Sequence, residues 1–245
     1  MLVIGPDPVA DGCVVWLDSS EYGGSGTTWN DVSGNGQNAT FGHGAIATHT
    51  AGTSGAFDFD AANERAYVNF DLTHFTTKGT TQSGTIEVWA KATDTGGGSG
   101  TTDAMLWDTG QGSNQGDEFS CRYKWSGNGY WNCYEDNSSG WTNMQAGGNG
   151  DADVAWHQVV FALDDGATMS GGAESRTFLD GQVSNSSTSN IGTFDTNIDR
   201  ITFGGQGNAS YPFNGKIAIA RVYNRPLTNS EVLKNFNSAK KRFGL

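Results

Sequence analysis

Short stretches in which apolar and polar residues alternate recur along the whole chain, and turns rich in glycine, asparagine and serine separate them. In 85–91, for example, Ile86, Val88 and Ala90 occupy every second position and therefore share one face of an extended strand. About a dozen such strands fit the sequence, and none is followed by a helical pattern of about 10–15 residues. The sequence therefore predicts an all-β antiparallel sandwich rather than alternating βαβ units.

The composition supports this prediction. Glycine accounts for 36 of the 245 residues and proline for only 4, as expected for many turns between strands rather than for a disordered proline-rich chain. Charged residues make up 16%, which argues against a helical protein rich in Lys and Glu. The glycine-rich stretches 93–102 and 137–153 do not separate two differently patterned halves, so we expect residues 1–245 to form a single domain.

One helix is signalled near the end of the chain. Thr228 and Glu231 have the spacing of a capping box, in which the side chain of each residue bonds to the backbone of the other. We expect a short C-terminal helix over about 229–239. Its buried face should contain Val232, Leu233 and Phe236, and Leu227 should pack on Val232 just outside the first turn.

Two further patterns make predictions about strand pairing. The stretches 56–59 and 66–70 are expected to form adjacent strands joined by a short turn. Cys121 and Cys133 flank a second hairpin, and a three-residue turn would place them opposite each other, whereas a turn of two or four residues would point them to opposite faces. With Cys13 the chain has three cysteines, so a Cys121–Cys133 disulfide and three free thiols both remain open.

The charge balance is acidic, with a formal net charge of −12 and one basic run at 240–242. An acidic surface repels phosphate backbones and anionic lipids, so nucleic acid is not an expected partner. No segment approaches the ~20 apolar residues of a membrane-spanning helix, so we expect no membrane insertion. Residues 1–12 lack the basic and apolar regions of a secretory signal.

Five segments, in order, resemble the laminin G-like branch of the concanavalin A-like lectin/glucanase superfamily. The most specific is Trp156-His157-Gln158-Val159-Val160 followed by Thr177-Phe178-Leu179-Asp180-Gly181. The resemblance implies a jelly-roll sandwich of two curved antiparallel sheets. The other four segments are 15–18 with 29–36, 54–59 with 67–68, 85–91, and 213–227 with Glu231.

Catalytic machinery is not expected. Relatives of this fold that hydrolyse glycans place acidic residues at i, i+2 and i+4 on one strand, so that the carboxylates share a face. No two of the seven glutamates here lie within ten residues of each other, and Glu87 is alone in its strand. The histidines lack zinc-ligand spacing, and no nucleophile elbow or phosphate-binding loop is present.

Calcium is the cofactor that the resemblance suggests, on a sheet rim between two loops. Oxygen donors at the matching positions are Asp108 on the first loop and Gln206 and Asn208 on the second, with Asp117 as a further candidate. The alternative is a solvated polar rim. The loop 31–36 contains the first half of an EF-hand pattern but lacks the glutamate at its twelfth position, and Asx turns are the alternative there.

A cluster of aromatic residues is the second candidate site. Trp125, Tyr130, Trp131, Tyr134 and Trp141 lie within 125–141, among Gly, Asn and Ser. Aromatic faces flanked by amide side chains suit sugar rings, because the rings stack while the amides bond hydroxyl groups. The sequence therefore predicts a ligand site at Trp125, Tyr130, Trp131 and Trp141, and the alternative is that the aromatic residues at alternate strand positions belong to the core.

The closing run 235–245 resembles the ends of laminin G-like proteins found among bacteriophage virion components. The first hypothesis is therefore a non-catalytic virion structural or decoration protein at the virion surface. Its partners would be capsid or tail proteins, host surface glycans and further copies of itself. The alternatives are a secreted or surface-attached lectin module in the extracellular space and, second, a glycoside hydrolase.

Overall fold

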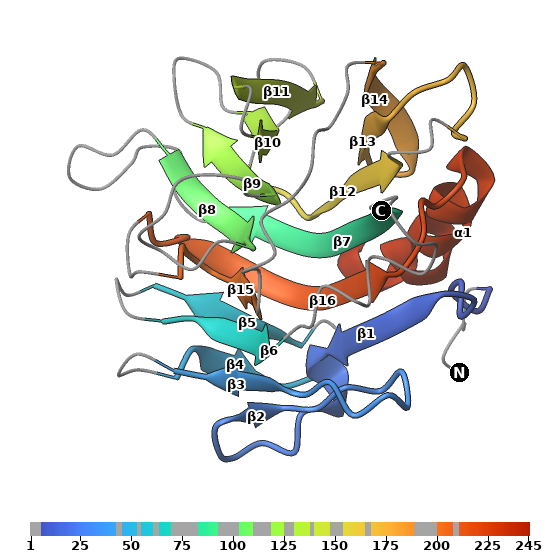
Figure 1. Ribbon diagram of the computed structural model, residues 1–245. Helices are drawn as coiled ribbons and strands as arrows, with labels where there is room; N and C mark the ends of the chain where they lie inside the picture. The colour runs from blue at the N-terminus through green and yellow to red at the C-terminus, as the bar shows by residue number, and fades with distance from the viewer. Residues whose placement is uncertain are drawn as a thin grey trace.

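The computed structural model describes residues 6–42, 46–52, 55–60, 64–69, 83–92, 103–109, 119–124, 130–137, 140–147, 154–164, 168–188, 200–207 and 211–245. Within these residues the chain forms two antiparallel sheets that enclose a core, with one α-helix near the C-terminus (Figure 1). The predicted all-β sandwich with a short C-terminal helix is confirmed.

The first sheet has the strand order β14-β13-β12-β7-β16-β5-β4, and β1 also pairs with β16. One edge of β16 is divided, because its first residues pair with β5 and its last residues pair with β1. The other edge pairs with β7. The strands are β1 (Cys13–Asp18), β4 (Thr48–Thr50), β5 (Ala56–Phe59), β7 (Ser83–Ala92), β12 (His157–Asp164), β13 (Ser175–Leu179), β14 (Gln182–Ser187) and β16 (Gly215–Tyr223).

The second sheet has the order β11-β10-β9-β8-β15-β6-β3-β2. It approaches the first sheet at one side, where the Thr177 hydroxyl donates to the carbonyl of Gln145 at 2.9 Å and links β13 to β11. Its strands are β2 (Thr28–Trp29), β3 (Ala39–Phe41), β6 (Ala66–Asn69), β8 (Asp103–Asp108), β9 (Phe119–Lys124), β10 (Tyr130–Asn137), β11 (Gly140–Ala146) and β15 (Arg200–Phe203).

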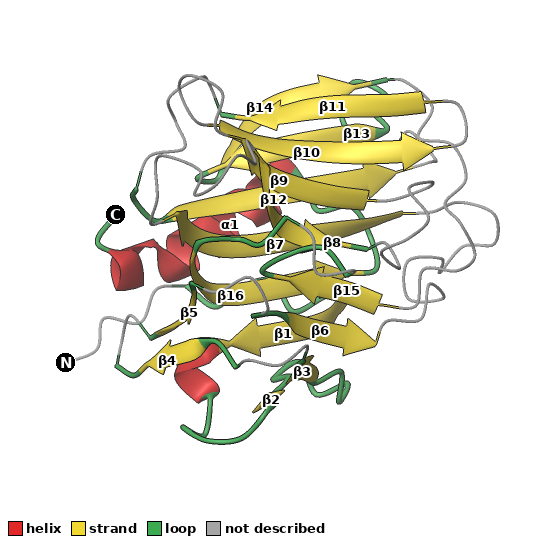
Figure 2. Cartoon of the chain, turned by 90° about the vertical axis from the view of Figure 1, so that its left-hand side faces the viewer, coloured by secondary structure: helices red, strands yellow, loops and turns green. Residues whose placement is uncertain are grey.

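The main core lies between the two sheets. Ile86, Val88 and Ala90 of β7 belong to it, as the alternation predicts. The residues between them, among them Glu87 and Trp89, are buried as well. A strand buried on both faces needs a cover on its outer side, and Figure 2 shows α1 (Asn229–Ala239) lying against this sheet.

The helix begins as the sequence predicts. Thr228 and Glu231 form the reciprocal capping box, and Leu227 and Val232 belong to one buried cluster. The helix packs on the outer face of the sheet, where the Phe236 ring stacks on Trp89 with a centroid separation of 5.6 Å.

The predicted buried face of the helix is partly wrong. Leu233 is exposed, whereas Val232, Asn235 and Ala239 are buried. The reason is polar: the Asn235 amide donates to Glu87 at 2.6 Å and to the Tyr223 hydroxyl at 2.9 Å, and it accepts from the Val9 backbone. A buried carboxylate needs hydrogen bonds, so the helix turns its asparagine toward the sheet.

The predicted pairing of 56–59 with 66–70 is also wrong. β5 lies in the first sheet between β4 and β16, whereas β6 lies in the second sheet between β3 and β15. The chain crosses from one sheet to the other between them. Alternation predicts both strands correctly, but it carries no information about which strand lies beside which.

Cys121 and Cys133 are opposite each other in the β9–β10 pair. Both are buried and both are free thiols, as is Cys13. Burial raises the pKa of the Cys121 thiol well above its ordinary value. Of the two alternatives left open, the structure has the cysteines facing each other in register but unlinked, with Lys124 and Tyr130 as the last pair before the turn.

Candidate functional site

Of the four residues predicted as an aromatic ligand site, the structure describes the side chains of two, Tyr130 and Trp131. Trp131 points into the core, where its ring meets Tyr123 edge-on at 5.2 Å and none of its side chain is exposed. Its prediction as a ligand residue is wrong, because β10 alternates and places position 131 on the inner face. Tyr130 is half-buried at the start of β10. The backbone of Trp141 lies in β11, and Trp125 lies outside the described residues.

Tyr134 of β10 packs against an arginine of the neighbouring strand. The guanidinium of Arg122, from β9, lies 4.5 Å from the centre of the Tyr134 ring and 5.2 Å from that of Tyr211. These cation–π contacts occupy ring faces that a sugar would need. The sequence does not reveal this arrangement, because Tyr211 is 77 residues from Tyr134 along the chain.

The structure brings together two of the predicted calcium ligands. Asp108 ends β8 and is paired in register with Thr202 of β15, and Gln206 follows in the next loop. Both Asp108 and Gln206 are buried. The Gly207 amide donates to Asp108 at 3.2 Å, which ties the two loops together. Asp117 and Asn208 lie outside the described residues.

The oxygen atoms of Asp108 and Gln206 meet only some of the requirements of a calcium site. Oxygen is the correct ligand type, and the side-chain oxygen of Gln206 is buried without a hydrogen-bond partner. However, Arg65 is buried beside the same loop: a Cβ added to Gly205 would lie 2.6 Å from its Nε atom. Among the described residues no three His, Cys, Asp or Glu side chains gather as a metal site. Calcium would therefore meet one carboxylate and a nearby positive charge.

The EF-hand-like loop, residues 31–36, has a structural role. The Asp31 carboxylate accepts backbone hydrogen bonds from Trp16 at 2.8 Å, Ser33 at 2.9 Å and Gln37 at 2.9 Å. The Asn35 side chain donates to the carbonyl of Cys13 at 3.1 Å. These contacts are those of an Asx turn tied to β1.

Glu87 has no access to a substrate. Its carboxylate faces α1 rather than solvent and accepts from Arg221 at 2.8 Å, Gln158 at 3.0 Å and Asn235 at 2.6 Å. The side chain is completely buried. A general acid must reach the atom that it protonates, so this carboxylate supports the structure.

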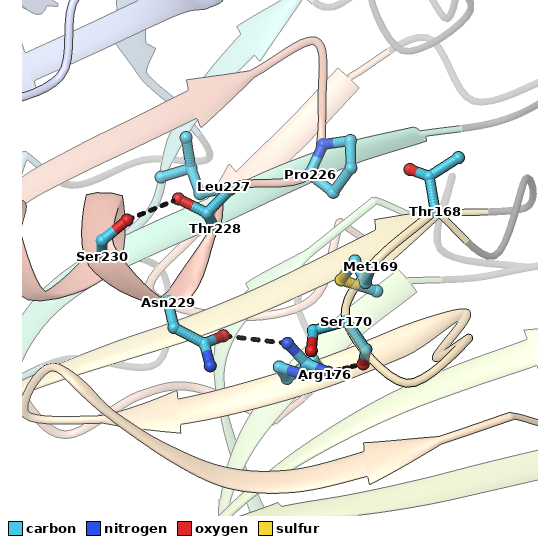
Figure 3. Close-up of a pocket in the computed structure, with 9 residues that line it drawn as sticks. All are labelled: Thr168, Met169, Ser170, Arg176, Pro226, Leu227, Thr228, Asn229 and Ser230. Carbon is cyan, nitrogen blue, oxygen red and sulfur yellow. Dashed lines mark hydrogen bonds between the residues drawn. The ribbon is translucent and has the colours of Figure 1, made fainter.

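A pocket of about 400 Å³ opens at the start of α1 (Figure 3). One wall is the turn after β12, and the other is the segment that leads into the helix. Each wall combines hydroxyl groups with apolar side chains, and one guanidinium completes the lining, a mixture that suits a sugar. The lining residues are Thr168, Met169, Ser170, Arg176, Pro226, Leu227, Thr228, Asn229 and Ser230.

Arg176 is the charged group of this pocket. It comes from β13, is 7% exposed, and donates to the Ser186 hydroxyl at 3.1 Å, the Asn229 side chain at 2.9 Å and the Ser170 carbonyl at 2.5 Å. Sequence reasoning missed the pocket, because its two walls are about fifty residues apart and neither carries a motif.

A family model described as the concanavalin A-like lectin/glucanases superfamily matches residues 62–233, more than half of the chain. No curated protein has a matching sequence. Within the described residues, no helix combines the length and the apolar character that a membrane crossing requires.

Several solved structures share the fold. Domain 4 of AbnA, an extracellular arabinanase from Geobacillus stearothermophilus solved with arabinotriose, has a TM-score of 0.62 at 15% identity, and the match covers 92% of this chain and 98% of that one. A botulinum neurotoxin type C structure, whose description concerns two ganglioside molecules, has a TM-score of 0.66 at 12% identity, over 94% of this chain and 52% of the other. Trypanosoma rangeli sialidase in complex with the inhibitor DANA has a TM-score of 0.66 at 16% identity. That match covers 98% of this chain and 36% of the sialidase chain.

Proposed function

Because this chain belongs to the concanavalin A-like lectin/glucanase superfamily, we propose that it is a non-catalytic module that binds glycans. The observation that carries the proposal is the pocket at the start of α1. It combines hydroxyl groups, a guanidinium and apolar side chains, as sugar sites do. The structures solved with arabinotriose and described with gangliosides are consistent with glycan binding on this fold.

The absence of catalysis is part of the proposal. The support is that Glu87, the acidic residue of the central strand, is buried in an ion pair, and that the sequence has no run of alternating acidic residues. The sialidase among the similar structures keeps a hydrolase as the alternative. Release of reducing ends from a panel of polysaccharides would establish that alternative and contradict this part of the proposal.

We further propose that the module is displayed on a virion, attached to capsid or tail proteins, with host surface glycans as its targets. The support is the resemblance of residues 235–245 to virion proteins. Mass spectrometry of purified particles, with copy number, tests it. Many copies beside a major capsid or tail protein are expected. A chain that is absent from such particles and occurs free outside cells would favour the secreted lectin.

A weak calcium site at Asp108 and Gln206, with Asp117 and Asn208 as candidate ligands, is a separate proposal. Its support is the buried side-chain oxygen of Gln206. With one carboxylate among the described donors, we expect dissociation constants in the range of about 10⁻⁴–10⁻³ M.

The first test of glycan binding is an array of immobilised glycans, probed with the purified chain in calcium and in EDTA. Binding to a defined set of glycans, lost when free glycan competes, is the expected result. A chain that binds no glycan under either condition would contradict the proposal. Trp125, Tyr130 and Trp141 stay predictions as contact residues, and the substitution of each by Ala on the same array tests them.

A further inference from the structure

We propose that the pocket at the start of α1 recognises an acidic sugar through its carboxylate or sulfate group, with Arg176 as the anion-binding residue. This inference rests on the proposed glycan-binding function and deepens it, because it names the chemical class of the ligand and the residue that selects it.

Three other arginines in the described part of the chain pair with a carboxylate: Arg221 with Glu87, Arg225 with Glu231, and Arg242 with Asp18.

Arg176 differs from all three. It is more than nine-tenths buried, and each of its three acceptors is a neutral oxygen, on Ser170, Ser186 or Asn229. Buried charges are almost always paired with an opposite charge. Within the described residues no carboxylate pairs with this guanidinium. A buried guanidinium that neutral groups hold beside a cavity has the character of an anion site.

The surroundings of the guanidinium strengthen this reading. Ser170 and Ser230 bring hydroxyl groups to the same pocket, and Figure 3 shows Arg176 beside Ser170 and Asn229 at its lower wall. The hydroxyls of Thr168 and Thr228 already donate to the carboxylates of Asp164 and Glu231. The nearest acid on the helix, Glu231, is already neutralised by Arg225 at 2.7 Å. The start of α1 adds a partial positive charge of its own.

The apolar part of the pocket and the net charge of the chain further restrict the chemical class of the ligand. Pro226 is partly exposed and gives an apolar surface on which the C–H face of a sugar ring can lie, whereas Met169 and Leu227 are part of the lining but buried. The chain as a whole carries a charge of −12, which repels polyanions such as nucleic acids. A single acidic residue within a short oligosaccharide fits better than a densely charged polymer.

The key variant is Ser230→Asp. Ser230 is exposed, lines the pocket, and lies in the first turn of α1, where an acidic side chain favours the helix. The variant is therefore expected to fold while placing a negative charge in the pocket that Arg176 also lines. Ser230→Asn is the neutral control of the same size, and Ser25→Asp adds the same charge at an exposed turn elsewhere. Arg176→Gln is the direct test, accepted only if its thermal unfolding remains cooperative.

The measurement is isothermal titration calorimetry with trigalacturonic acid, a sulfated galactose disaccharide and neutral galactotriose as probes. The carboxylated and sulfated arms show which acidic group is preferred. We expect at least one acidic probe to bind about tenfold more tightly than galactotriose, and Ser230→Asp and Arg176→Gln to weaken it about tenfold, while both controls bind like the parent chain.

Two outcomes would overturn the inference in distinguishable ways. If galactotriose binds as well as the acidic probes and Ser230→Asp changes nothing, the chain binds glycans but this pocket does not select an acid, and the proposed function survives. If neither these probes nor the glycan array shows binding, the inference and the proposed function fail together.

Discussion

The carboxylate of Glu87 and the guanidinium of Arg221 form a buried ion pair, 2.8 Å apart, on the outer face of the first sheet. The two residues face each other in register on β7 and β16. Arg221 also lies 4.9 Å from the centre of the Trp16 ring. This pair joins the central strands to α1 through Asn235.

Removal of one member of the pair should destabilise the fold strongly. Glu87→Gln leaves the Arg221 charge buried without its partner, which costs about 3–5 kcal/mol in comparable sites. The free energy of unfolding in urea measures this effect. Replacement of both residues, as Glu87→Leu with Arg221→Met, should cost less than Glu87→Gln alone, and an equal or larger cost would contradict the explanation.

The orientation of α1, with Asn235 buried and Leu233 exposed, gives a second prediction. Leu233→Gln should change the free energy of unfolding by less than about 1 kcal/mol, because this side chain is exposed. Asn235→Ala should cost about 2 kcal/mol or more, because Glu87 loses a donor and the Val9 amide loses an acceptor. Equilibrium unfolding of both variants tests the orientation of α1, and the reverse order of costs would refute it.

Gly204 cannot carry a side chain. Its φ is +87°, and an added Cβ would overlap the Phe59 ring. Gly204→Ala should therefore cost more than the ~1–2 kcal/mol of the left-handed conformation alone. Gly171 is the matched control, with φ of +80° and open space around it, so Gly171→Ala should cost only that amount. Equal destabilisation of the two variants, measured by thermal unfolding, would show that the Phe59 contact is unimportant.

Because of the carboxylate of Glu231 in the helix cap, the free energy of unfolding should fall as the pH becomes acidic. Hydrogen bonds from Arg225, and then from Thr228, lower the pKa of Glu231 to about 2. A carboxyl with a lowered folded-state pKa stabilises the fold above its unfolded pKa and loses this contribution as the pH falls from about 4.5 to 2. Unfolding curves across this range should show a smaller slope for Glu231→Gln. The same substitution at the exposed Glu21 is the control, and an equal change in both would contradict the assignment.

Calcium binding can be separated from packing at Gln206. In EDTA, Gln206→Met should leave the free energy of unfolding unchanged or raise it by up to about 1 kcal/mol. The reason is that the substitution removes a buried oxygen that has no hydrogen-bond partner. If Gln206 holds calcium, millimolar calcium should raise the melting temperature of the parent chain but not that of the variant. A parent chain that does not respond to calcium would contradict the proposed site.

Local sequence patterns alone determine several features of this fold. The capping box at Thr228 and Glu231 fixes where the helix begins, and the alternation of Ile86, Val88 and Ala90 fixes which face of β7 enters the core. These features depend on residues a few positions apart, and their geometry follows from the backbone alone. The recurring alternation predicted the all-β sandwich, and the family resemblance implied its jelly-roll form.

Only the tertiary structure decided which strands are neighbours and which polar groups meet. It placed β5 and β6 in different sheets, turned Asn235 rather than Leu233 toward Glu87, and buried Trp131. It also brought Arg176 beside the start of a helix about fifty residues further along the chain. These outcomes follow from the packing and charge balance of the whole chain, because a buried charge or ring is stabilised by whichever groups surround it, and those come from distant segments.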